Sequence, residues 1–341
     1  MFFFMSLKLS ICIPTFNRPS QLPNCLNSIC IAKANSNIDF DVCISDNGSN
    51  YDVKKIVDNF TDKLKITLNI NKKNLGYQPN LIKAISLSNS EFVWTIGDDD
   101  LLTPNSLKLL DELFEKFRDV DFYYINSFHL NYEYLKKFER PFNTNLLPSN
   151  MPKLAKKKNS MECRFWDLID YRITFDFLMG NFTNVFKRQM FLENLDCLDK
   201  ENLKDNRLCS NLDNCCGYVK VYAHAFKNSK AYYSPVGFSV NCYGVREWVS
   251  MYDFMEIVRI PEILDYYRSQ GLGLKKYLIN KNYALRNFSN FFFKIFIRGE
   301  SAGRHYVKFY KHFLSNLIFP NAILSIFYFL FRKISSLRKQ I

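Results

Sequence analysis

The chain has 341 residues, of which 48% are hydrophobic and 23% charged, with 11 Pro and 11 Gly. This length and composition suffice for a large core and exclude collagen-like, disordered and low-complexity proteins. The formal net charge is +13 at pH 7, and from Tyr266 onward 14 Lys and Arg residues face one acid, Glu300. Residues 1–265 are therefore balanced, and a basic partner surface is expected in the C-terminal fifth alone.

The first 127 residues alternate between apolar runs and segments whose apolar residues have helical spacing. The apolar runs predict strands at residues 7–14, 40–45, 65–70, 91–96 and 122–125. The helical spacing predicts helices within residues 22–29, 53–60, 79–87 and 104–114. Strands that alternate with helices indicate an α/β domain with a largely parallel sheet.

Polar clusters follow three of the predicted strands. They are Thr15-Phe16-Asn17-Arg18, Asp46-Asn47-Gly48-Ser49 and Asp98-Asp99-Asp100. Ligands of such sheets bind outside the carboxyl ends of the strands. We therefore expect the three clusters to line one crevice.

The second half of the chain is less regular. Beyond Ser127 the alternation fades, and the polar stretch 141–160 is predicted to be a mobile excursion at a boundary. Residues 179–188 are predicted to form a loop and a strand that face the crevice. The ten cysteines contain no C-x-x-C pair and are expected to be reduced, which favours a cytoplasmic body.

Three consecutive carboxylates after a buried strand repel one another unless a cation lies between them. Hard oxygen ligands suit Mg²⁺ or Mn²⁺, which one or two carboxylates and substrate phosphates commonly hold. The alternative is an acidic turn at a helix start, where anions are favoured. In the same way Asp46 can bind a base or ribose or can merely form a turn, and Arg18 can contact phosphate or merely begin a helix.

In these motifs the chain resembles the nucleotide-sugar glycosyltransferases of family 2, which have the GT-A fold. The resemblance rests on residues 10–18 (SICIPTFNR), 45–49 (SDNGS), 74–77 (NLGY) with Asn80 and Ala84, and 94–100 (WTIGDDD). Four motifs in the family's order and spacing cover about residues 8–120. The GDDDLL form and residues 180–184 (GNFTN) look most like the abequosyltransferase-type branch of surface-polysaccharide assembly.

The resemblance implies a donor site and a metal site. Its expected donor-binding residues are Pro14, Thr15, Asn17, Arg18, Asp46, Asn47, Gly76, Asp98 and Asp99. In one register Asp98 faces the ribose and Asp100 holds the metal; in the other Gly97 replaces the first Asp and Asp99 is the ligand. We favour Asp100 and retain Asp99. The expected cofactor, Mn²⁺ or Mg²⁺, would neutralise the departing diphosphate.

Family members usually invert the anomeric carbon, with a general base from an acidic pair in the second half of the domain. Here Cys216-Gly217 stands where that pair is expected, which leaves Asp213 as the first candidate and Asp205 as the second. Both can equally be loop carboxylates of no catalytic role. Asn181 and Trp248 are the expected acceptor-binding residues.

The C-terminal segment 313–331 is nearly uncharged but is interrupted by Asn316, Pro320 and Asn321, and its clean apolar run from Ala322 has ten residues. A membrane span needs about 20 apolar residues. With its flanking Lys and Arg residues the segment predicts an interfacial element on an anionic membrane, and a core or dimer-packing helix is the alternative. No nucleic-acid partner is expected, because no recognised module is present.

The sequence thus predicts a GT-A type α/β fold: a mostly parallel nucleotide-binding sheet flanked by helices, with a helical basic C-terminal extension. The expected parts are a nucleotide-sugar half at 6–127, an acceptor half at 128–265 and the extension at 266–341. The predicted activity is metal-dependent, inverting sugar transfer to a saccharide or lipid-linked glycan, on the cytoplasmic face of the inner membrane. A non-catalytic nucleotide-sugar or membrane-binding scaffold is the alternative.

Overall fold

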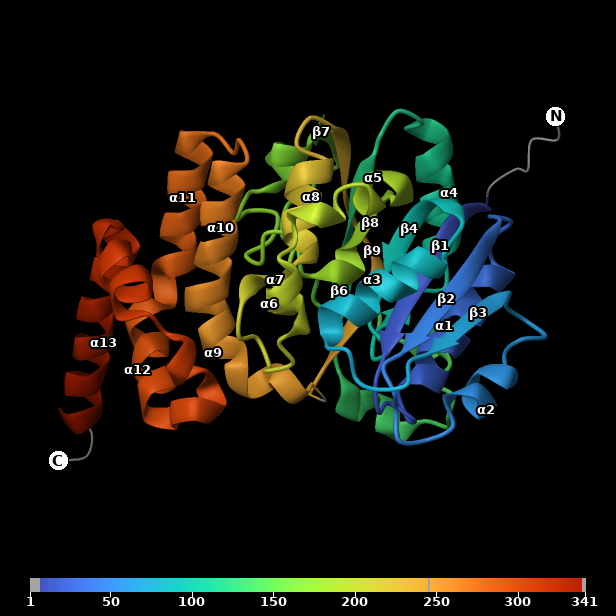
Figure 1. Ribbon diagram of the computed structural model, residues 1–341, viewed down its shortest axis with the longest axis horizontal. Helices are drawn as coiled ribbons and strands as arrows, with labels where there is room; N and C mark the ends of the chain where they lie inside the picture. The colour runs from blue at the N-terminus through green and yellow to red at the C-terminus, as the bar shows by residue number, and fades with distance from the viewer. Residues whose placement is uncertain (1–6, 245, 339–341) are drawn as a thin grey trace.

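The computed structural model describes residues 7–244 and 246–338, with side chains at 7–244, 246 and 248–329. Figure 1 shows an elongated molecule in which the sheet and its covering helices occupy the centre and one end. The last helices of the chain form the opposite end. The predicted α/β class with a helical C-terminal region is confirmed.

Within the described residues, one nine-stranded sheet has the order β3-β2-β1-β4-β8-β6-β9-β5, and β7 pairs with β9. The strands are β1 Leu7–Thr15, β2 Phe40–Asp46, β3 Ile66–Ile70, β4 Ser90–Thr95, β5 Leu101–Leu102, β6 Phe122–Asn131, β7 Met161–Arg164, β8 Asn184–Lys187 and β9 Lys230–Tyr243. The first four strands are mutually parallel, β8 is antiparallel to its two neighbours, and β6 and β9 are parallel. The carboxyl ends of β1, β2, β4, β6 and β9 therefore lie along one edge.

Helices cover both faces of the sheet because successive strand residues point to opposite sides. Ile11 and Ile13 of β1 enter a core with α1, α2 and α4, whereas Cys12 enters a second core with α3 and α8. The helices of this part are α1 Leu22–Ala34, α2 Val53–Asp58, α3 Tyr77–Leu87, α4 Ser106–Lys116, α5 Arg188–Leu192, α6 Lys200–Lys204, α7 Leu212–Cys216 and α8 Tyr218–Ala225.

The prediction of a mobile excursion at 141–160 is wrong. Phe142 is fully buried, its backbone N–H donates to Asn24, and its carbonyl accepts from Asn27. Farther along, the backbone N–H of Ala155 donates to Asn126 of β6 at 2.8 Å. Polar composition suggested mobility, but these side-chain amides satisfy the segment's backbone and fix it to the sheet.

The predicted part boundaries fall inside elements. Residues 127 and 128 both lie in β6, so the two halves share one sheet. The long strand β9, which lies within the expected acceptor half, was not predicted. The boundary at 265/266 falls within α10, so the C-terminal helical region begins earlier than predicted.

The C-terminal region is a set of helices that packs on a core of its own. It comprises α9 Tyr252–Phe254, a π-helix Met255–Arg259, α10 Ile260–Ser269, α11 Leu274–Ala284, α12 Phe288–Arg298, a second π-helix Phe309–Phe313 and α13 Pro320–Arg338. Ile260, Ile263 and Leu264 of α10 join the core of the sheet domain, which attaches the region to that domain. No single helix in the described part of the chain is long and apolar enough to span a membrane. Segments Phe309–Ile318 and Pro320–Phe329 meet the length and hydropathy requirement together but are bent by 99°.

Candidate active site

The candidate site lies at the edge of the sheet where β1, β2 and β4 end. Thr15 closes β1 in register with Asp46 at the end of β2. The backbone N–H of Ile96, just beyond β4, donates to Cys12, which brings the following aspartates beside β1. Thr15 Oγ1 then donates a 2.6 Å hydrogen bond to Asp98. The three polar clusters thus meet at this edge of the sheet, as expected from the sequence.

Gly97 lets the three carboxylates fold back around the loop. A Cβ at this position would lie 2.7 Å from Asp99 Oδ1 and 3.0 Å from Asp100 Oδ2. Burial and the neighbouring charge of Asp99 raise the pKa of Asp98 to about 8 and that of Asp100 to about 7. The carboxyl groups of the loop are therefore costly to keep ionised together without a cation.

Two arginines face this charge. Arg18 Nε lies 4.0 Å from Asp98. Arg246, which was not predicted as a site residue, places its guanidinium 3.3 Å from Asp99 Oδ2 and 3.3 Å from Asp100 Oδ1. Arg246 follows β9, which is separated from β4 by β8 and β6 in the sheet.

The contacts of the aspartates distinguish the two possible metal ligands. Asp100 is 2% exposed. Its carboxylate accepts hydrogen bonds from the backbone N–H groups of Gly97 and Cys242 and from the side chain of Asn241. Asp99 faces Arg246 and keeps more acceptor capacity. Asp100 thus ties the loop to β9. These contacts favour Asp99 as the metal ligand, although the sequence led us to prefer Asp100.

The loop after β2 is built by side-chain hydrogen bonds. Asp46 accepts from both the backbone and the hydroxyl of Ser49, with 2.6 Å to the hydroxyl. Asn17, at φ 53°, accepts from the backbone of Asn50, and its own N–H donates to Ser49. These hydrogen bonds join the loop after β1 to the loop after β2. A contact of Asp46 with a base stays a prediction.

Asn47 lies together with Gly76, which comes just before α3, beside the same edge of the sheet. Asn47 accepts from the backbone N–H of Leu75 and donates to Asn74 and to the Gly76 carbonyl. Its amide is thereby committed to the fold, so the predicted ligand role of Asn47 is not supported by its contacts. Gly76 has φ 89°, and a Cβ there would lie 3.3 Å from Oδ1 of Asn206. The loop between α6 and α7 therefore approaches the chain at Gly76.

The two predicted acceptor residues lie in different surroundings. Asn181, before β8, donates to the Tyr77 hydroxyl at 2.7 Å, where α3 begins. Trp248 lies beneath the guanidinium of Arg246, 5.7 Å from its ring centre, and stacks on Tyr252 with 6.5 Å between centroids. An aromatic pair beside the aspartate loop suits the face of a sugar, but acceptor binding by these residues stays a prediction.

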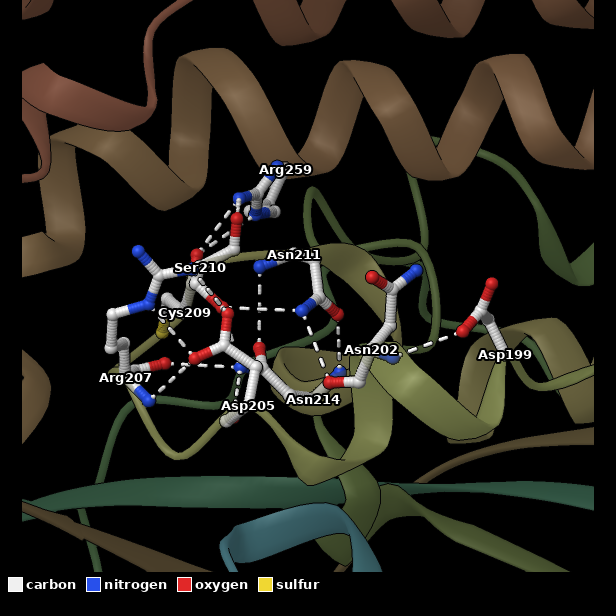
Figure 2. A network of polar contacts seen from close by, with 9 residues as sticks. All are labelled: Asp199, Asn202, Asp205, Arg207, Cys209, Ser210, Asn211, Asn214 and Arg259. Atoms are coloured by element: carbon white, nitrogen blue, oxygen red, sulfur yellow. Dashed lines mark hydrogen bonds and ion pairs between the residues drawn. The ribbon is translucent and has the colours of Figure 1, made fainter.

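Neither predicted base is free. Figure 2 shows Asp205 inside a polar network of the α6–α7 loop, where it accepts from the side chains of Arg207 and Ser210. These hydrogen bonds, above all that from Arg207, hold its pKa well below the usual range, so it is poorly suited to remove a proton. Asp213 accepts from Lys220 at 2.6 Å and from Asn202 at 3.3 Å. No contact brings either carboxylate to the described aspartate loop.

The residues present fit a divalent ion held in part by its substrate. Among the described residues, no group of three or more His, Cys, Asp or Glu is arranged to hold a metal on its own. One carboxylate, that of Asp99, has oxygens available beside Arg246. Mg²⁺ and Mn²⁺ are commonly bound by one or two carboxylates with substrate phosphates, so this donor set suits such an ion.

His129, Asn241 and Arg246 were missed because no local motif marks them. His129 lies in β6 and hydrogen-bonds Asn241, and burial lowers its pKa. Asn241 in turn donates to Asp100. The link from β6 through β9 to the aspartate loop depends on strand pairing between residues more than 100 positions apart in the chain.

Comparison with known proteins shows what this chain is similar to. Residues 10–173 match the family description Glycosyl transferase family 2. Abequosyltransferase RfbV of Salmonella typhimurium is 34% identical over 114 residues, 33% of this chain and 34% of the relative. The GalNAc(5)-diNAcBac-PP-undecaprenol beta-1,3-glucosyltransferase of Campylobacter jejuni is 35% identical over 109 residues, 30% of this chain and 33% of the relative. The chain thus spans about a third of the length of these relatives.

Solved structures show the same fold. TarS residues 1–349 of S. aureus in complex with UDP align with a TM-score of 0.56 at 18% identity, over 83% of this chain and 72% of that one. Mannosyltransferase PcManGT of Pyrobaculum calidifontis, in complex with GDP-Man and Mn²⁺, aligns with a TM-score of 0.50 at 12% identity, over 87% of this chain and 77% of that one. The predicted family resemblance and GT-A fold are confirmed.

Proposed function

We propose that this chain, in which residues 10–173 form a glycosyl transferase family 2 domain, moves a sugar from a nucleotide-diphosphate donor to an acceptor glycan of a surface polysaccharide. The observation that carries the proposal is the meeting of Thr15, Asp46 and the carboxylates of Asp98–Asp100 at one sheet edge. That edge is where α/β sheets bind ligands. The glycan belongs to a capsule, lipopolysaccharide or lipooligosaccharide.

The donor is held by groups already fixed in place. The loops after β1 and β2, which carry Asn17, Asp46 and Ser49, present polar atoms for the base and ribose. Asp98, which accepts a hydrogen bond from Thr15 at the end of β1, lies next to Asp99 in the chain. Asp99 would hold Mn²⁺ or Mg²⁺, which when bound supplies charge neutralisation for the departing diphosphate. Arg18 adds positive charge beside Asp98, and Arg246 adds positive charge beside Asp99.

The comparisons support this reading without fixing the donor. One structural neighbour binds UDP, and another binds GDP-Man with Mn²⁺. The predicted stereochemical outcome, inversion, stays a prediction, because Asp205 and Asp213 are engaged in other contacts.

We further propose that the acceptor is lipid-linked and that the C-terminal helices lie on the cytoplasmic face of an anionic membrane. Three of their side chains, Phe309, Tyr310 and Ile318, are 56–78% exposed. Ring contacts of 4.7–5.0 Å join Phe309 through two other phenylalanines to Phe296 of α12. With 14 basic residues against one acid after residue 265, this apolar face suits anionic headgroups.

The test is nucleotide release by the purified protein from UDP-, GDP-, CDP- and dTDP-sugars, with and without Mn²⁺, in the presence of membrane extract as acceptor. Metal-dependent release that Asp99→Asn abolishes supports catalysis and names the donor. The Asp58→Asn variant, on the exposed surface of α2, is the matched control and keeps full activity.

The alternative is a scaffold that binds nucleotide-sugar without transfer. The observation that favours it is the engagement of both predicted bases in structural contacts. Donor binding without nucleotide release, with every donor and with membrane extract present, would support the scaffold against the enzyme.

A further inference from the structure

Arg246 lies beside the carboxylate of Asp99, the group that we expect to hold a metal ion. Its Nε lies 3.3 Å from Asp99 Oδ2, and its Nη2 lies 3.3 Å from Asp100 Oδ1. The Arg246 side chain is 17% exposed, so water screens these contacts little. Arg246 is therefore a counter-ion built into the site.

Oδ2 of Asp99 cannot bind both the guanidinium of Arg246 and a metal ion without weakening one of the two contacts. Asp100 is committed to Gly97, Asn241 and Cys242, so Asp99 is the carboxylate with room for a metal. A divalent ion on Asp99 would repel the guanidinium and displace it from Oδ2. The displaced guanidinium would then be a largely buried cation that has lost part of its counter-charge, which is unfavourable.

A diphosphate removes this difficulty. Its oxygens match the planar fork of a guanidinium, which binds phosphate through two parallel hydrogen bonds. The Arg246 side chain therefore has a second partner within the same site once a nucleotide diphosphate is present.

We propose that Arg246 keeps the divalent ion out of the empty site and turns to the diphosphate when the donor arrives, so that metal and donor bind interdependently. This inference rests on the proposed function and concerns the order in which its components assemble. By linkage, the factor by which nucleotide strengthens metal binding equals the factor by which metal strengthens nucleotide binding. Arg246 is the residue that sets much of this factor.

The experiment is Mn²⁺ binding to the full chain, followed by the electron paramagnetic resonance signal of free Mn²⁺. Arg246→Gln is expected to bind Mn²⁺ alone about tenfold more tightly than the unaltered protein, a factor typical of coupling between sites. Added UDP, GDP, CDP or dTDP strengthens Mn²⁺ binding to the unaltered protein, and this enhancement shrinks in Arg246→Gln. Arg246→Lys keeps a positive charge and is expected to retain weak binding of Mn²⁺ alone.

Arg18→Gln is the matched comparison, because Arg18 faces Asp98 and not Asp99. It is expected to change the affinity for Mn²⁺ alone less than Arg246→Gln does. Stabilisation against urea by Mn²⁺ gives a second readout, since a ligand stabilises the folded state according to its affinity. This readout also shows whether each variant is folded.

Equal or weaker Mn²⁺ binding by folded Arg246→Gln would overturn the inference. So would an unchanged nucleotide enhancement in that variant. Either result is compatible with metal-dependent nucleotide release that needs Asp99, so the proposed function can stand when the inference fails. Loss of release in every donor screen would instead count against the proposed function.

Discussion

Asp213 and Lys220 form an ion pair of 2.6 Å in which the side chains are 6% and 12% exposed. Asn202 donates a further hydrogen bond to the same carboxylate. The pair joins α7 to α8. It engages the carboxylate of Asp213, which was the first candidate for the general base in the sequence. Its geometry is that of a structural contact between two short helices.

The first prediction concerns Asp213→Asn. Removing one partner of a buried ion pair leaves the other charge uncompensated, so we expect a loss of about 3 kcal/mol in the free energy of unfolding. Urea denaturation measures this loss, and kcat of the folded variant is expected to change little. Asp58→Asn, which breaks an exposed pair with Lys54, is the control and should cost less than about 0.5 kcal/mol. A collapse of kcat with unchanged stability would restore Asp213 as the base.

The second prediction concerns pH. Burial and the charge of Asp99 raise the pKa of Asp98 to about 8 and that of Asp100 to about 7. The unfolded chain has these groups at about 4, so between about pH 4 and 8 the folded state binds more protons than the unfolded state. These two groups therefore lower the stability of the metal-free protein as pH rises through that window.

Urea unfolding of metal-free protein at several pH values checks this. Asp98→Asn removes one of the two groups, and its stability relative to the unaltered protein is expected to improve as pH rises from 5 to 8. A difference that is independent of pH would contradict the assignment. Asp119→Asn is the control: a hydrogen bond from Lys230 lowers the pKa of that carboxyl, so Asp119 is ionised in the folded and the unfolded state above pH 5, and the stability difference of this variant is expected not to change between pH 5 and 8.

Local motifs predicted the first half of the site, and tertiary pairing supplied the rest. Thr15 and Asp46 are the last residues of β1 and β2, and Asp98 follows β4 within a few residues, so the topology of a parallel sheet suffices to bring them together. Arg246 depends on β9, whose pairing with β6 contains register shifts near Asn126 that leave no periodic signal in the sequence. Asp100 as a metal ligand stays a prediction, and its partners Asn241 and Cys242, which also come from β9, were likewise not expected from the sequence.

The third prediction concerns Arg259, which anchors the network shown in Figure 2. Its guanidinium donates to the Cys209 carbonyl at 2.8 Å and to the Ser210 carbonyl at 2.7 Å, and it pairs with Glu262. Arg259→Met leaves two carbonyls without a donor and weakens a buried ion pair, so we expect a loss of about 3 kcal/mol. Amide hydrogen exchange of residues 205–211 should accelerate.

The control for that variant is Arg207→Met in the same loop. The Arg207 side chain is 70% exposed, and solvent screens its pair with Asp205, so the expected loss of stability is much smaller than that of Arg259→Met. Equal losses in the two variants would mean that Arg259 does not anchor the loop. Because Asn206 lies against Gly76, loosening of this loop is also expected to raise KM for the donor.

The fourth prediction concerns membrane binding by the C-terminal helices. Tyr310 and Ile318 are each 78% exposed, and burying such side chains at the interface contributes about 1.5–3 kcal/mol each. The double variant Tyr310→Ser and Ile318→Ser is therefore expected to weaken cosedimentation with phosphatidylglycerol vesicles at least tenfold. Binding of the unaltered protein should fall in high salt and with uncharged phosphatidylcholine vesicles, because the basic residues act over about one Debye length.

Leu146→Ser and Val236→Ser together provide the matched control, since both side chains are exposed but belong to the sheet domain. This control is expected to bind vesicles like the unaltered protein. The Tyr310 and Ile318 variant should still release nucleotide with a soluble acceptor, because those residues are separate from the aspartate loop. If it sediments with anionic vesicles as well as the control does, the exposed face packs against protein instead of lipid, and the proposed membrane location fails while the proposed transfer reaction stands.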